Sequence, residues 1–158
     1  MSPSTSPHHE HLKRIIGHWS FTSSVWPPGA TEPLSITGSL RADAIQGGLF
    51  VQSLWAGSVA GQSFTALAID GYDPAEGRYT TVSIDNLSPA TLIYTGQCDG
   101  TGTVRTMHGQ VRDPETGAVA DDRAVTTFHE DGTVTTVNWR TPAGGAEYKA
   151  METRLTPQ

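Results

Sequence analysis

A chain of 158 residues can bury one sizeable core but has no room for a second ordinary domain, so a single domain is expected over residues 8–158. The formal net charge is −6, and the basic residues never cluster along the chain, which argues against nucleic acid as a partner. Cys98 is the one cysteine, which excludes an intrachain disulfide and a cysteine-based zinc site and predicts a reducing, cytoplasmic compartment.

The first residues do not resemble a targeting segment. Residues 1–7 are mostly Ser, Thr and Pro, and this composition predicts a flexible tail. They have neither the basic start nor the apolar run of a secretory signal. No later segment is apolar enough to span a bilayer, so we expect no membrane partner.

One short helix and ten strands are predicted. In residues 8–16, Leu12, Ile15 and Ile16 lie at helical spacing, which predicts a short helix covering one end of the fold. From Gly17 onward the pattern alternates with period two and is broken by turn residues. Because short turns join antiparallel neighbours, an all-β, up-and-down barrel that removes its own sheet edges is expected. The predicted strands cover residues 17–26, 34–44, 49–57, 62–70, 78–86, 91–98, 103–112, 119–129, 133–140 and 146–155.

Alternation also predicts which side chains face the interior. In the first strand, Trp19 and Phe21 share one face and are expected to point inward. The second strand alternates most clearly, with Leu40 and Ala42 inward and its charged residues in water. Most inward aromatic residues form core, but aromatic walls with a few polar groups are also typical of small-ligand pockets.

The two ends of the chain support a family resemblance. The opening Gly17-His18-Trp19 and the closing residues 151–154 (METR) resemble the calycin arrangement of lipocalins and fatty-acid-binding proteins. More narrowly, residues 47–50 (GGLF), 71–73 (GYD), 84–86 (IDN) and 151–152 (ME) resemble a bacterial lipocalin-like family catalogued as a domain of unknown function, DUF1579. The resemblance covers residues 11–155 and implies the barrel fold, whereas the family supplies no general activity.

In calycins the first-strand tryptophan packs under an arginine of the last strand, and here these would be Trp19 and Arg154. This implied contact points Arg154 inward, and Glu152, Ala150 and Tyr148 then share its face. In an apolar lumen, Glu152 is a candidate general acid or base. The alternative is a buried ion pair between Glu152 and Arg154 that only fixes the barrel end.

His108 is a further candidate proton shuttle, although the alternation of its strand does not decide which face lines the lumen. Asp85 lies near a barrel mouth, where it could contact ligand. The catalytic candidates are therefore Glu152, Tyr148 and His108. The ligand-binding candidates are Trp19, Phe21, Trp55, Phe64, Asp85, Tyr94, Trp139 and Arg154.

No cofactor or metal is predicted. The sequence has no glycine-rich phosphate loop, no G-x-S-x-G elbow and no CxxC pair. The run from His8 to His11 lacks the spacing of a zinc peptidase. Related haem barrels of the nitrobindin type use a histidine near the chain end, and this sequence has none after His129. Haem is therefore the less favoured ligand, with His108 or His129 as its only candidate ligands.

Two functions remain open. The lumen is expected to bind a small, mainly apolar organic molecule, either in a cofactor-independent cyclase or isomerase of bacterial specialised metabolism or in a carrier without chemistry. Monomer and homodimer are both compatible with an outward-facing Trp26.

Overall fold

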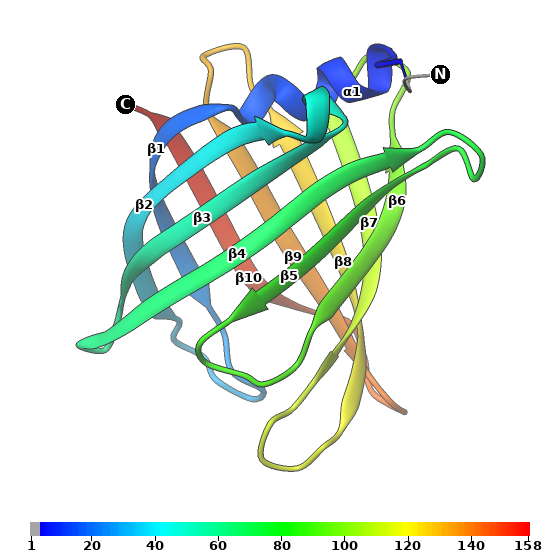
Figure 1. The fold of residues 1–158 in the computed structure, drawn as a ribbon. Coiled ribbons are helices and arrows are strands. Elements are labelled where there is room, and N and C mark those ends of the chain that lie inside the picture. Colours follow the sequence, from blue (N-terminus) through cyan, green and yellow to red (C-terminus); the bar gives the residue numbers. More distant parts are fainter. Residues whose placement is uncertain (1–3) are drawn as a thin grey trace.

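The protein is a barrel of ten antiparallel strands in which each strand pairs with the next along the chain. The computed structural model describes residues 4–158. The expected all-β architecture is confirmed (Figure 1). The strands are β1 (Gly17–Val25), β2 (Leu34–Ile45), β3 (Phe50–Val59), β4 (Gln62–Asp73), β5 (Arg78–Asp85), β6 (Leu92–Cys98), β7 (Val104–Arg112), β8 (Val119–Phe128), β9 (Val134–Pro142) and β10 (Tyr148–Pro157).

Pairing of β1 with β10 closes the barrel. Seven consecutive residue pairs join the two strands, from Trp19 opposite Pro157 to Val25 opposite Met151. On its other side β1 pairs with β2, so neither terminal strand offers a free edge. The closure separates an inner face from an outer face along every strand.

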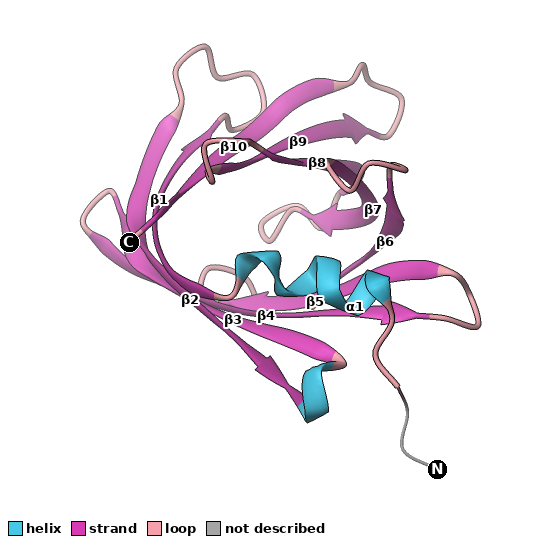
Figure 2. Cartoon of the chain, turned by 90° about the horizontal axis from the view of Figure 1, so that it is seen from above, coloured by secondary structure: helices cyan, strands magenta, loops and turns pink. Residues whose placement is uncertain are grey.

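A short helical segment covers one end of the barrel. It comprises α1 (Pro7–Leu12) and the 3₁₀ turn η1 (Lys13–Ile15), and it lies across that end in Figure 2. Leu12 is buried in the core, and the Trp19 indole donates a hydrogen bond of 2.8 Å to the Ile15 carbonyl. A helix this short depends on such packing for its stability. Within residues 4–158, no helix is both long and apolar enough to cross a membrane.

The predicted flexible tail is only partly covered by the structure. Residues 1–3 lie outside the described residues, and Pro7 already belongs to α1. The backbone N–H of Ser6 donates to Nδ1 of His9, so Ser6 caps the helix.

The core follows the predicted alternation. Trp19, Phe21, Leu40 and Ala42 are all buried on the inner face. The core has two clusters of buried residues. One contains Trp19, Phe21, Ile36, Leu40, Phe128, Val134 and Leu155, and the other contains Leu12, Ala42, Val51, Tyr79 and Met107.

A β-bulge reverses the phase of the last strand. Tyr148 lies opposite Arg140, but after the irregularity at Lys149/Met151 it is Met151 that lies opposite Asn138. The extra residue is Ala150, and it moves every later side chain to the other face. The prediction that Glu152 and Arg154 share the inner face of Ala150 and Tyr148 is therefore wrong. Thr153 and Leu155 are the buried residues instead.

Truncation of Leu40 tests the core. Leu40 is 1% exposed and Leu34, on the same strand, is 49% exposed. We expect Leu40→Ala to lower the free energy of unfolding by about 2–5 kcal/mol, because it leaves a cavity. Leu34→Ala should change it by less than about 0.5 kcal/mol. Urea unfolding followed by circular dichroism measures both, and equal losses would contradict this assignment of the core.

Candidate functional site

Aromatic side chains gather on the inner face of the first four strands. The Phe21 ring lies 5.1 Å from that of Trp55 and 6.5 Å from that of Phe64, both in edge-on geometry. Phe21 is buried, whereas Trp55 and Phe64 are only partly buried although they pack against the core. The three rings form an apolar wall with surface left to contact a ligand.

Small side chains line the neighbouring part of the lumen. Ser53, Ala68 and Ser83 lie opposite one another on β3, β4 and β5. Ala68 and Ser83 share the inner alternation of their strands but are not fully buried. Solvent therefore reaches the inner wall at this row, where the small side chains leave room.

A polar network built on Asp122 lies inside the barrel. The Asp122 side chain is fully buried, and its Oδ2 accepts hydrogen bonds from the Tyr94 hydroxyl at 2.9 Å and Asn138 Nδ2 at 2.7 Å. Its Oδ1 accepts from Arg140 Nε at 3.1 Å, which makes an ion pair. Burial, followed by the Asp122 charge and its hydrogen bond, raises the pKa of Tyr94 above the usual range. Tyr94 therefore stays a hydrogen-bond donor.

Three buried polar atoms keep hydrogen-bonding capacity that the protein does not use. Within the described residues, Ser53 Oγ, Asn138 Oδ1 and Arg105 Nε have no partner. All three residues share the inner alternation of their strands. A buried polar group without a partner is costly, and native proteins contain few of them.

The covered end of the lumen carries a cluster of histidine and tyrosine. His8 stacks on Tyr72 with ring centroids 4.0 Å apart, and its Nδ1 lies 3.0 Å from the Tyr79 hydroxyl. His11 packs edge-on against Tyr79 and Phe128. Burial and then the nearby positive charges lower the pKa of His11 to about 4, and burial raises the pKa of Tyr79 to about 12. Both groups are therefore neutral near pH 7.

Five of the eight predicted ligand-binding residues face the interior, and the other three, Asp85, Trp139 and Arg154, do not. The inward set is Trp19, Phe21, Trp55, Phe64 and Tyr94. Trp139 lies on the outer face, where the Arg123 guanidinium sits 5.9 Å from its ring centroid. Asp85 ends β5, and its Oδ1 accepts the backbone N–H of Leu87 and of Ser88, so this carboxylate shapes a turn.

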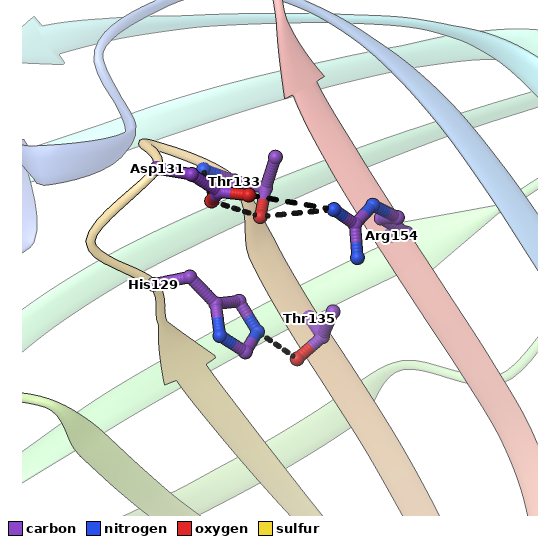
Figure 3. A network of polar contacts seen from close by, with 5 residues as sticks. All are labelled: His129, Asp131, Thr133, Thr135 and Arg154. Carbon is purple, nitrogen blue, oxygen red and sulfur yellow. Dashed lines mark hydrogen bonds and ion pairs between the residues drawn. The ribbon is translucent and has the colours of Figure 1, made fainter.

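Arg154 points away from the lumen. Its Nη2 lies 3.7 Å from Asp131 Oδ2 and 3.3 Å from Thr133 Oγ1, in the turn between β8 and β9 (Figure 3). The implied packing of Arg154 on Trp19 is therefore wrong, since the Trp19 indole bonds to the capping segment instead. His129, drawn beside this network, is exposed and bonds to Thr135.

The predicted catalytic residues do not converge. Glu152 is on the outer face and pairs with Lys149. His108 is exposed, while Arg105 and Met107 of the same strand are buried, which decides the face that the sequence left open. Tyr148 lies opposite Arg140 at the uncovered end of the barrel. These three side chains cannot act on one substrate atom.

Two pockets lie against the barrel wall. One, of about 340 Å³, is lined by residues of β7, β8 and β9 that include the buried Asp122 and the exposed His108 and Asp121, together with Glu147. The other, of about 480 Å³, touches β3, β4 and β5 and combines the outward-facing Leu54, Leu67 and Ile84 with the inward-facing Trp55 and Ala66. Among residues 4–158, no group of three or more His, Cys, Asp or Glu side chains could hold a metal ion.

Sequence reasoning missed Asp122, Asn138, Arg140 and Arg105. A signal was present for Asp122, because it shares its alternation with Ala124 and Phe128 and so places a carboxylate on an apolar face. The partners of Asp122 come from two other strands, and no local pattern links them.

A closed meander of ten antiparallel strands is an up-and-down β-barrel, a fold consistent with a lipocalin-like family. The chain belongs to the family described as protein of unknown function (DUF1579), whose model matches residues 4–156. This confirms the family resemblance seen in the sequence. A comparison with curated proteins finds no match.

Neutralising Asp122 tests the internal network. We expect Asp122→Asn to lower the free energy of unfolding by about 2–4 kcal/mol, because it leaves Arg140 without its anion and disturbs three hydrogen bonds. Asp121→Asn, at the exposed neighbour, should cost less than about 0.5 kcal/mol. Chemical denaturation of both variants provides the measurement, and a loss confined to Asp121→Asn would refute the network.

Acidification tests the burial of His11. Since its pKa falls from 6.5 unfolded to about 4 folded, the unfolded chain binds more protons between these values, so stability is lost as the pH falls through this window. We expect His11→Gln to flatten the fall in Tm between pH 6.5 and 4. Exposed His108→Gln is the control and should keep the wild-type profile. Parallel profiles for all three proteins would contradict the assignment.

Proposed function

We propose that the protein binds a small, mainly apolar organic molecule in the barrel lumen. The observation that carries this proposal is an inner wall that stays partly accessible, at Trp55, Phe64 and Ala68, inside an otherwise closed barrel. Burial of apolar ligand surface against such a wall supplies the affinity. The few buried polar atoms without partners supply orientation.

The aromatic wall and the Asp122 network would contact different parts of the ligand. Phe21, Trp55 and Phe64 offer ring faces and edges to an apolar body. Asn138 Oδ1 is an acceptor without a partner among the described residues, so it favours a ligand hydroxyl or amide at that depth. A carrier or storage protein needs no more than this arrangement.

A cofactor-independent cyclase or isomerase is the second candidate, and one observation favours it. The Tyr94 hydroxyl and the Asp122 carboxylate, 2.9 Å apart, form an acid–base pair inside the lumen. In such an enzyme the Tyr94 hydroxyl would pass its proton to the Asp122 carboxylate as it takes one from the bound substrate. The reverse transfer to another atom of the substrate would restore both groups, and Arg140 would hold Asp122 in place. The outer-face residues Glu152 and His108 have no part in this proposal.

Filling the lumen tests the binding site. The probe is phenylnaphthylamine, a neutral fluorophore whose emission rises in apolar surroundings. We expect Ala68→Trp to weaken its binding at least ~10-fold, because the new indole occupies the space beside Ser53 and Ser83. Ala56→Trp is the matched control, since Ala56 is exposed on the outer face of β3, and it should bind like the wild type.

The outward-facing side of the pocket on β3, β4 and β5 is the competing location. Ile84 is 49% exposed there, and Ile84→Ser should leave probe binding unchanged. Loss of binding in Ile84→Ser, with none in Ala68→Trp, would place the site outside the barrel and refute the proposal. Circular dichroism and Tm confirm that each variant is folded.

A further inference from the structure

Arg105 is a buried arginine at the covered end of the lumen. It lies on β7 in phase with Met107 and is 9% exposed. Cys98 and Thr126 are its neighbours across the sheet, and its guanidinium carbon lies 5.8 Å from the Tyr79 ring centroid. The guanidinium therefore lies beneath α1, beside the neutral side chains of Tyr79 and Thr126.

No anion in the described part of the chain pairs with this guanidinium. Among residues 4–158 the structure contains no ion pair and no hydrogen bond to the Arg105 guanidinium, and its Nε is fully buried without a partner. Arg140, the other arginine on the inner face, is 28% exposed and pairs with the fully buried Asp122. Burial of an unpaired charge costs several kcal/mol, so buried charges are normally paired.

The surroundings of Arg105 favour an anion over a neutral group. His11 is close enough to Arg105 to feel its charge and is neutral near pH 7. Arg14 adds a second positive charge near His11. The nearby Asp99 is exposed and already accepts hydrogen bonds from its own turn. Asp70, buried on β4, accepts from Thr81 and adds one negative charge to the lumen, which disfavours a dianion.

We propose that the lumen ligand is an apolar monocarboxylic acid whose carboxylate binds Arg105 beneath α1. This inference rests on the proposed function and specifies the ligand class. A planar guanidinium matches a carboxylate in two parallel hydrogen bonds, and one unpaired cation balances one negative charge. The apolar body of the acid runs from Arg105 toward Phe21, Trp55 and Phe64.

Displacement of phenylnaphthylamine by dodecanoic acid and by dodecanol measures how much the carboxylate contributes to binding, because the two molecules differ only in their head group. At slightly alkaline pH we expect the wild-type protein to bind the acid at least ~10-fold more tightly than the alcohol, as a charge-assisted hydrogen bond implies. Arg105→Met should remove this preference and keep binding of the probe and of the alcohol. Arg105→Lys retains the charge without the planar fork and should show an intermediate preference. Arg112→Gln, an exposed site on the same strand, should behave like the wild type.

The outcomes separate the two proposals. If the wild type binds probe, acid and alcohol with no preference for the acid, the assignment of Arg105 fails and the lumen site stands. If it binds none of the three, the proposed function fails and the inference fails with it. The comparison of acid and alcohol uses the wild-type protein, so it decides the question even where an Arg105 variant does not fold.

Discussion

Closure of the sheet by β1 and β10 is the constraint on which the rest of the structure depends. The pairing joins Trp19 to Pro157, at opposite ends of the chain, and it leaves no strand edge exposed. Once the sheet is closed, side-chain alternation alone decides whether a residue lines the lumen or meets solvent. Every feature of the candidate site follows from that division, including the burial of Asp122 and Arg105.

The two arginines on the inner face, Arg140 and Arg105, differ in whether the protein supplies a partner for their charge. Arg140 forms an ion pair with Asp122, and Asp122 also accepts hydrogen bonds from Tyr94 and Asn138. The charge of Arg140 is therefore neutralised within the protein. Arg105 has no such partner among the described residues. A fully satisfied buried network rigidifies a fold, whereas an unsatisfied charge favours a ligand of opposite sign.

The barrel could be predicted from the sequence because closely spaced turns and period-two alternation are local signals. Trp19 and Phe21 face inward as their alternation indicates. The phase of the last strand could not be predicted, because no local sequence pattern indicates the bulge at Ala150. This bulge turns Glu152 and Arg154 outward. The Asp122 network was likewise hidden, since its members come from β6, β8 and β9 and meet only when these strands pair in the observed register.

The covering segment is attached by a different kind of contact from those that join the strands of the barrel. Within the described residues, α1 shares no backbone hydrogen bond with any strand. It is attached by side chains, through His8 to Tyr79, His11 to Cys98 and Leu12 in the core. Release of this segment therefore breaks no hydrogen bond between strands and costs less free energy than opening any strand. The covering segment is thus a separable unit of stability that continues into β1 through Ile16 and lies over the buried charge of Arg105.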